Sequence, residues 1–311
     1  MTIHPCYIGC DISKASLDFY DPDTSKLVSV GNTPDAIAAH LQVYRDRSVF
    51  VVYEATGTYD RALAHALAET SIPSHRINPM QAKRFAQAIG QKAKTDPLDA
   101  RMLADLGARL TPVADNRPAP EREALAGLHR RRDQLVELRK RERTRVKEET
   151  CPRLKASHDQ VISLLSEEIA LFDEEIAALI KADQKMCREA ALLQTAPGVG
   201  PVTVTTLIAL MPELGTINPK QAASLAGLAP FNHDSGKLKG RRCISGGRRR
   251  VRRALYMAAL NAVRRSDRFQ TFYQRLTARN QAKKVALITF GGKTGPFPFS
   301  IPPHLESYSS F

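Results

Sequence analysis

Apolar residues along the first hundred positions follow two different periods. Short alternating or β-branched runs predict strands, and runs with apolar residues three and four positions apart predict helices. The expected strands are residues 3–12, 17–20, 27–30, 48–54 and 73–77, and the expected helices are 34–44, 60–69 and 79–89. Three early strands followed by strand–helix alternation indicate an α/β fold, with a mixed sheet covered by helices.

Two local signals sharpen this prediction. Thr33 and Pro34 supply an N-cap and a proline at the first helical position, so the first helix is expected to begin there. The run "SVFVVYE" at 48–54 is rich in β-branched residues and is expected to be a strand buried on both faces. Such a strand belongs in the interior of the sheet.

The pattern changes between residues 121 and 185, where long charged helices are predicted, with a break at Cys151-Pro152. Apolar residues then step by four, three, four and three positions, which is a coiled-coil seam sustained for two heptads. The seam consists of Leu165, Ile169, Phe172, Ile176 and Leu179. We expect a helical hairpin or an oligomer seam, and the alternative is a single amphipathic helix packed on its own domain.

A compact helical domain is predicted from Gln194 onward. The stretch "TAPGVGPVTVTTLIAL" places Gly198 and Gly200 between two helices, as in a helix-hairpin-helix turn. Backbone N–H groups in such a turn are candidates to meet a phosphate. A tight packing turn explains the two glycines equally well.

Charge adds a partner to this picture. The chain of 311 residues carries a net charge of +14 and has a sequence pI near 9.7, which points to a polyanionic partner. Twelve basic and two acidic residues lie between 229 and 268, so the basic surface is local. We predict nucleic-acid contacts at Gly198 and Gly200 and at the basic residues Lys237, Lys239, Arg241, Arg242, Arg248, Arg249, Arg250, Arg252 and Arg253.

Cysteine usage and hydropathy exclude several classes of protein. The five cysteines are scattered without a C-x-x-C pair, which argues against a disulfide framework and against a zinc site. No segment approaches the roughly 18 apolar residues of a membrane span, and the first residues do not resemble a signal peptide. We therefore expect a cytoplasmic protein with no membrane partner.

Four acids stand at positions that suit a metal site. Asp11 lies inside the apolar run "YIGCDISK", where a carboxylate is costly to bury unless it is paired, protonated or bound to a metal. Glu54 ends a predicted strand, and Asp96 and Asp99 in "KTDPLDARMLA" share one helical face. Carboxylate clusters bind Mg²⁺ or Mn²⁺, and a pair of such ions supports phosphoryl transfer.

Each acid also has a structural alternative. Asp96 and Asp99 are equally suited to an ordinary helix start, as N-cap and as an acid favoured by the helix dipole. Asp11 could turn outward beside Ser13, and Glu54 could pair with Arg61.

Six ordered blocks resemble a known family. They are "YIGCDISK", "YEATGTYD", "INPMQAKRFAQA", "KTDPLDARMLA", "APGVGPVTVTTLIA" and "ASLAGLAPFNHDSGKLKGRRCISGGRRRVRRALYMAAL". They look like the successive motifs of the DEDD transposases of the insertion-sequence-110 class, which are Piv/MooV-like. The likeness runs in order from about residue 7 to residue 285.

The resemblance implies a fold, a site and partners. It implies an RNase H-like (RuvC-like) catalytic domain, whose acidic tetrad falls on Asp11, Glu54, Asp96 and Asp99, and a nucleophilic serine at Ser235 in "HDSGK". It also implies a covalent phosphoserine intermediate on DNA, donor and target DNA as substrates, and a structured non-coding guide RNA. Ser235 by itself reads as an ordinary turn residue, and Ser245 in "CISGG" is the alternative nucleophile.

On this basis we expect four segments. These are an RNase H-like catalytic domain at 1–118, a helical coiled-coil segment at 119–190, an all-α transposase domain at 191–289, and an atypical, disordered tail at 290–311. The tail departs from the family, because "FGGKTGPFPFSIPPHLESYSSF" stands where a further helix is expected, and its glycines and prolines are expected not to continue a helix. A frameshifted or truncated gene copy would produce such an end.

Three functions remain open at this stage. The first is a transposase or site-specific recombinase, acting as a dimer or tetramer with a guide RNA. The second is a metal-dependent junction nuclease that hydrolyses DNA with the acids alone. The third is a decayed copy that binds nucleic acid without catalysis. Ser235 separates the first two functions, because hydrolysis has no use for it.

Overall fold

The computed structural model describes residues 5–55, 57–90, 96–115, 119–231, 243–278 and 282–292, without the side chains of 96–98, 231 and 288–292. The chain divides into two compact units, residues 1–117 and 118–311. Each unit has its own apolar core. The two units are therefore described separately.

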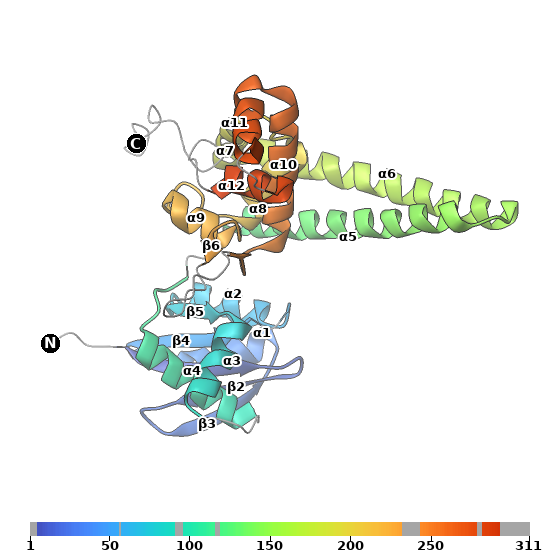
Figure 1. Cartoon of the computed structure of the whole chain (residues 1–311). Coiled ribbons are helices and arrows are strands. Elements are labelled where there is room, and N and C mark those ends of the chain that lie inside the picture. Colours follow the sequence, from blue (N-terminus) through green and yellow to red (C-terminus); the bar gives the residue numbers. More distant parts are fainter. Residues whose placement is uncertain are drawn as a thin grey trace. The chain divides into compact units, whose positions relative to one another are not determined.

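The first unit contains a mixed sheet of five strands among the described residues, in the order β3-β2-β1-β4-β5 (Figure 1). Strands β1, β2 and β3 form an antiparallel meander, and β4 and β5 run parallel to β1. The strands are β1 (Cys6–Ile12), β2 (Ser16–Asp21), β3 (Lys26–Gly31), β4 (Val49–Glu54) and β5 (Ser74–Ile77). This order and these directions are those of an RNase H-like fold, so the α/β prediction is confirmed.

Helices cover both faces of this sheet. They are α1 (Pro34–Leu41), α2 (Arg61–Glu69), α3 (Pro79–Ala88) and α4 (Asp96–Leu110). Because side chains alternate along a strand, Ile8 and Cys10 of β1 enter the core with α1 and α2, together with Val51 of β4. Phe50 and Val52 of β4 face the other way and pack with α3 and α4.

The predicted elements of this unit are confirmed with two local corrections. Thr33 precedes α1 but forms no side-chain cap hydrogen bond, so Pro34 is the local feature that fits the helix start. The α-helix ends at Leu41, and a 3₁₀ turn at Gln42–Tyr44 completes the segment expected to be helical. The expectation for β4 holds, because its first five residues are buried.

The second unit begins with two long helices, α5 (Pro120–Glu148) and α6 (Pro152–Ala182), which form an antiparallel hairpin. Polar contacts cross the hairpin from Arg132 to Asp173 (2.9 Å) and from Arg139 to Ser166 (3.1 Å). The predicted break at Cys151-Pro152 is confirmed, since Pro152 is the first residue of α6. Ile176 of the predicted seam is buried, and we call this hairpin the helical arm (Figure 1).

The rest of the second unit packs around the base of the helical arm. Its elements are α7 (Gln184–Gln194), α8 (Pro201–Leu210), α9 (Pro219–Leu225), β6 (Pro230–Phe231), β7 (Cys243–Ile244), α10 (Arg249–Arg265), α11 (Asp267–Ala278) and α12 (Lys283–Gly292). Arg122 of α5 is buried here, where it donates to both carboxylate oxygens of Glu189 (2.6 and 2.7 Å) and to the carbonyl of Ile208 (3.0 Å). This ion pair ties α5 to α7 and α8.

The expectation that the glycines after Thr289 cannot continue a helix is wrong for the first two of them. Helix α12 extends through Gly291 and Gly292. Glycine lowers helix stability by about 1 kcal/mol relative to alanine but does not forbid the conformation, whereas proline does, and the first proline follows only at position 296. The remaining tail lies outside the described residues. Within the described ranges, no helix combines the length and the apolar character needed to cross a membrane.

Candidate active site and nucleic-acid surface

Two acids of the predicted tetrad end neighbouring strands. Asp11 is the penultimate residue of β1, Glu54 is the last residue of β4, and the two strands are parallel with Cys10 opposite Tyr53. One step further along this register brings Asp11 beside Glu54, at the strand spacing of about 4.8 Å. Both side chains lie on the face opposite Cys10 and Tyr53, which is the face that α4 covers.

Helix α4 brings a third acid to the same face. Asp99 is half-buried in its first turns and precedes Ala100, whose carbonyl lies against Gly9 of β1. A Cβ on Gly9 would stand 1.9 Å from that carbonyl oxygen and 2.6 Å from the amide nitrogen of Ala104. The missing side chain therefore lets α4 approach β1 two residues before Asp11. Asp96 is the first residue of α4, and its side chain is outside the description.

Gly9→Ala is expected to reduce both stability and catalysis. The added methyl group forces α4 away from β1, a loss of about 1–3 kcal/mol by overpacking, and moves Asp99 relative to Asp11. The free energy of unfolding in urea and the DNA cleavage rate measure the two effects. Gly31→Ala is the matched control, because the nearest atom to its Cβ is a side-chain carbon at 3.9 Å. Equal effects of the two variants would contradict the close-packing role of Gly9.

The structure adds Asp18, a residue that the sequence analysis did not single out. The antiparallel register places Asp18 of β2 directly opposite Asp11. Leu17 and Phe19 on either side of it are buried in the core with α1 and α2, so Asp18 shares the face of Asp11. The alternation of apolar and polar residues in β2 predicts that Asp18 lies on the face opposite Leu17 and Phe19. Only the strand register shows that Asp18 lies beside Asp11.

We call the α4 side of the sheet at Asp11, Asp18 and Glu54 the acidic face. Its negative charges affect a neighbouring thiol. Burial, reinforced by the charges of Asp11 and then Asp18, raises the pKa of the Cys10 thiol well above its usual range. Carboxylates directly opposite on neighbouring strands destabilise a sheet unless a cation or a proton offsets them. The donor set consists of hard carboxylate oxygens, which fits Mg²⁺ or Mn²⁺ and does not fit zinc or copper.

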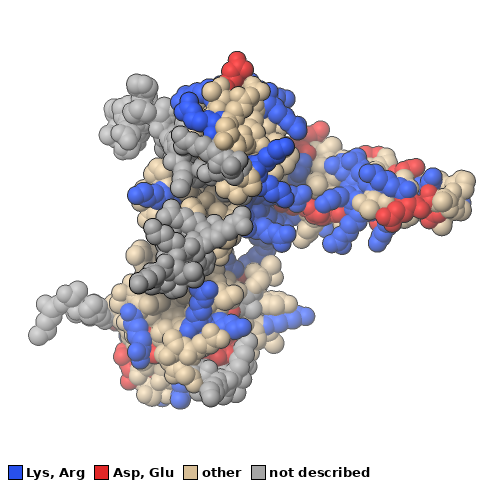
Figure 2. Space-filling view, in the orientation of Figure 1, with Lys and Arg blue, Asp and Glu red and all other residues tan. Residues whose placement is uncertain are grey.

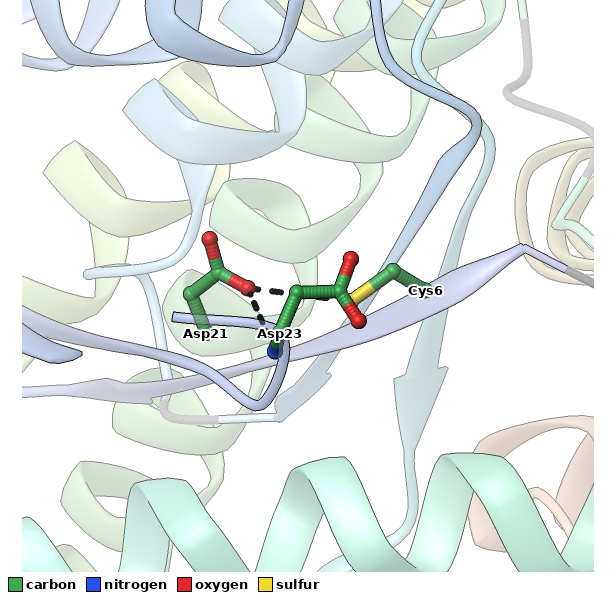
Figure 3. Close-up of side chains that lie close together, drawn as sticks. All are labelled: Cys6, Asp21 and Asp23. Atoms are coloured by element: carbon green, nitrogen blue, oxygen red, sulfur yellow. Dashed lines mark hydrogen bonds between the residues drawn. The ribbon is translucent and has the colours of Figure 1, made fainter. Parts of the chain in front are cut away.

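A second group of possible ligands lies at the opposite end of β1 and is not part of this face. Ligand atoms of Cys6, Asp21 and Asp23 lie within 4.8 Å of one another (Figure 3). The guanidinium of Arg47 already binds both carboxylates, at 2.6 Å from Asp21 and 2.9 Å from Asp23. Burial and the neighbouring Asp23 raise the pKa of Cys6 to about 11, so its thiol is protonated at neutral pH. This group is an ion-pair cluster that stabilises the sheet.

Arg47→Gln is expected to lower stability at neutral pH by about 1.5–3 kcal/mol, the range for hydrogen bonds to charged groups. Hydrogen bonds from Arg47 hold the pKa of Asp21 below its usual range, so the native state favours the ionised carboxylate. That stability is fully present above the unfolded pKa of about 3.9 and is lost as the pH falls through the lower folded value. Urea unfolding from pH 7 to pH 2 should therefore show the difference between wild type and variant shrinking below about pH 4. A difference that is constant with pH would contradict this role for Asp21.

The basic residues at the start of α10 fall into two groups. Arg248 donates to the carboxylate of Glu213 (2.6 Å) and to the carbonyl of Leu210 (2.8 Å). Arg252 donates to the carbonyls of Gly227 (3.1 Å) and Gly246 (2.9 Å). These two arginines hold the turn before α10 against α8 and α9, and their predicted nucleic-acid contacts stay a prediction.

The other three arginines of this segment face solvent. Arg249 is exposed, and Arg250 and Arg253 have side chains that are 45% and 68% exposed. Arg250 and Arg253 also reach the carboxylates of Asp133 (3.6 Å) and Glu137 (2.8 Å), so their exposed guanidinium groups are partly neutralised. Ser245, the alternative nucleophile, is also exposed, in the turn before α10. The predicted residues Ser235, Lys237, Lys239, Arg241 and Arg242 lie outside the described residues.

Gly198 has a packing role. It adopts φ = +81°, and a Cβ there would stand 2.3 Å from the carbonyl oxygen of Ala258 and 2.5 Å from the amide nitrogen of Ala262 in α10. The tight-turn alternative accounts for this glycine. Gly200 precedes α8 with nothing within 4 Å of its Cβ position, and its predicted phosphate contact stays a prediction.

Comparison with known proteins places these features in a family. A model described as Transposase, for the DEDD type of IS110, matches residues 8–149, and a model described as Transposase IS116/IS110/IS902 family matches 190–274. The pilin gene-inverting protein of Moraxella bovis is 30% identical over 295 residues, which cover 91% of each chain, and its counterpart in Moraxella lacunata gives the same values. The chain belongs to the IS110 family of transposases.

Two further similarities cover parts of this transposase. An insertion element IS110 protein of Streptomyces coelicolor is 30% identical over 130 residues, 41% of this chain and 31% of its own. Two RuvC structures from Thermus thermophilus, one in complex with a Holliday junction substrate, match 36% and 35% of the transposase. Their identities are 18% and 17%, the TM-score is 0.27 for both, and the match covers 99% and 98% of those chains.

Family membership confirms the resemblance read from the six sequence blocks. It establishes that this transposase is an enzyme that binds and acts on DNA. It also implies a divalent metal, in keeping with the carboxylate oxygens on the α4 face of the sheet.

Proposed function

We propose that this transposase is a site-specific recombinase that cuts and rejoins DNA through a covalent phosphoserine, guided by a structured non-coding RNA. The observation that carries the proposal is the placement of Asp11 and Glu54 at adjacent strand ends on the face that α4 covers with Asp99. The relatives from Moraxella, which are named as gene-inverting proteins, support recombination as the outcome.

In this proposal Asp11, Glu54, Asp96 and Asp99 hold one or two Mg²⁺ or Mn²⁺ ions. Bound there, the ions would polarise the scissile phosphate and stabilise the charge that develops on it. The carboxylates themselves position the ions at the carboxyl ends of β1 and β4. The close contact of α4 with Gly9 fixes the distance between the ligands on these strands and the ligands on α4. Asp18 adds negative charge to the same face.

Ser235 is the proposed nucleophile. Its Oγ forms a bond to phosphorus as one bridging P–O bond of the DNA backbone breaks, the serine gives up its proton, and the leaving sugar oxygen takes one up. One phosphate ester replaces another, so the reverse step rejoins DNA without an external energy source. Arg249, Arg250 and Arg253 are suited to hold the backbone phosphates near this step.

The acids belong to the first unit and Ser235 to the second, and we propose that the enzyme works as a dimer or tetramer. Donor and target DNA are the substrates, and pairing with the guide RNA supplies the sequence specificity. The basic segment at 237–253 binds the phosphate backbone of these nucleic acids.

Incubation of the purified protein with labelled donor DNA, Mg²⁺ and the RNA transcribed from the flanking non-coding region tests this proposal. We expect a covalent protein–DNA adduct on a denaturing gel, which disappears with EDTA or without RNA. Cleaved DNA without an adduct would instead indicate the metal-dependent junction nuclease. Binding without cleavage would indicate a non-catalytic copy.

A further inference from the structure

Helix α5 of the helical arm has an outer face that α6 does not cover. Leu135, Arg139 and Glu142 point toward α6, since Leu135 is buried, Arg139 donates to Ser166, and Glu142 lies 2.7 Å from His158. At 100° per residue, the opposite side of the helix carries a different set of residues. We call this set the outer face of α5: Arg130, Asp133, Glu137, Lys140, Arg141 and Thr144.

At the base of the helical arm, α10 lies against this outer face. Arg250 lies 3.6 Å from the carboxylate of Asp133, and Arg253 donates to Glu137 at 2.8 Å. The hydrogen bond from Arg253, together with the charge of Lys140, holds the pKa of Glu137 below its usual range. Both acids of the outer face are therefore already paired with arginines of α10.

From Lys140 to Thr144 the outer face carries basic residues and no acid. Lys140 and Arg141 are exposed, and neither forms an ion pair in the described part of the chain. Glu137 stands three positions before Lys140 and four before Arg141, but its carboxylate already accepts a hydrogen bond from Arg253. The cations of Lys140 and Arg141 therefore share one acid, which Arg253 already binds.

Arg253 of α10 and the basic residues of the outer face lie near one another, because Arg253, Lys140 and Arg141 all act on the carboxylate of Glu137. Figure 2 shows Lys and Arg side chains at the base of the helical arm and along it, with Asp and Glu side chains among them. From Asp133 to Arg141 the helix rises by about 12 Å, a length over which each strand of a duplex presents about three phosphates. This spacing suits a nucleic-acid backbone that runs from α10 onto the arm.

We propose that Lys140 and Arg141 on the outer face of α5 bind the phosphate backbone of a nucleic-acid duplex whose adjoining part is held by Arg249 and Arg253 of α10. The helical arm is then a nucleic-acid-binding element and not only a hairpin or a seam between subunits. This inference rests on the proposed function and extends its binding surface to a segment that the basic sequence run at 237–253 does not include.

The test compares two double variants of full-length protein. Lys140→Gln with Arg141→Gln removes the outer-face charges. Arg131→Gln with Arg143→Gln removes two equally exposed charges of α5 that point away from this face. The affinities for a DNA duplex of about 30 base pairs and for an RNA hairpin are measured between about 50 and 200 mM salt.

We expect the outer-face variant to lose roughly tenfold in affinity near 150 mM salt and about two units of log–log salt slope, one for each phosphate contact. The control variant should keep the slope of the wild type. Loss on DNA, on RNA or on both probes supports the inference and identifies the backbone that is bound. Unchanged affinity, or an equal loss in both variants, overturns it.

A third variant separates this inference from the proposed function. Arg249→Gln with Arg253→Gln removes the cations of α10 that the proposed function assigns to DNA. If only this variant loses affinity, the inference that the outer face binds nucleic acid is wrong, and the proposed function is retained. If none of the variants loses affinity, the nucleic-acid contacts that the proposed function assigns to α10 are wrong as well. Thermal melting by circular dichroism checks that all variants are folded.

Discussion

Asp11→Asn is expected to lower the rate of DNA strand cleavage by about 10³-fold or more, a barrier increase of about 4 kcal/mol, while the protein remains folded. Asparagine keeps the shape of the side chain but loses the charge that a divalent ion requires from the centre of the acidic face. Cleavage and adduct formation are measured on labelled donor DNA with Mg²⁺. The melting temperature provides a second measurement that does not depend on catalysis.

The melting temperatures separate a metal site from a structural carboxylate. Mg²⁺ should raise the melting temperature of the wild type, because an ion that binds only the native state stabilises it. It should have less effect on Asp11→Asn, because that variant lacks one of the proposed carboxylate ligands. Asp46→Asn, at an exposed turn, is the control with the same loss of charge. Retained cleavage, or an equal Mg²⁺ response in all three proteins, would refute the metal site.

Ser235→Ala is expected to abolish the covalent adduct while leaving folding and nucleic-acid binding unchanged. Alanine removes the only side-chain atom of this residue that can form the ester bond to phosphorus, whereas the loss of a single hydroxyl usually costs little stability. The adduct is followed on a denaturing gel, and binding is followed by gel shift on the same DNA. Ser245→Ala is the matched control, since it removes an exposed hydroxyl from the turn before α10. Adduct formation by Ser235→Ala would refute the assignment and make Ser245 the residue to test.

The two inactive variants together test how subunits share the reaction. Asp11→Asn supplies an intact Ser235, and Ser235→Ala supplies an intact acidic face. If one subunit provides the acids and another provides the serine, a mixture of the two proteins should regain part of the adduct. Absence of any adduct in the mixture would mean that both groups act from the same chain.

Local patterns predicted many helices and strands of both units, because each of these patterns depends on residues that are close together in the sequence. The β-branched run of β4 led to a buried strand, and the break at Pro152 followed from the missing N–H of proline. The end of α12 was misjudged for a related reason. Glycine only weakens a helix, so packing can carry the helix through Gly291 and Gly292.

The candidate site was predictable only in part. The sequence placed Asp11 and Glu54 at strand ends and Asp99 on a helix, and the family resemblance joined them into a tetrad. Asp18 escaped notice because an acid in an alternating strand is ordinary, and its importance depends on the register that pairs it with Asp11. A register shift by one residue would turn Asp18 to the other face.

The sequence by itself determined the alternation of strands and helices, the helical hairpin and the location of the basic segment, since each depends on residues near one another in the chain. Only the tertiary structure decided which distant partners the arginines of this segment meet. Arg248 meets Glu213 across 35 residues, and Arg253 meets Glu137 across 116. Contacts of this range depend on how whole elements pack, because the entropy of closing such long loops is offset only by the complete core and not by any local pattern.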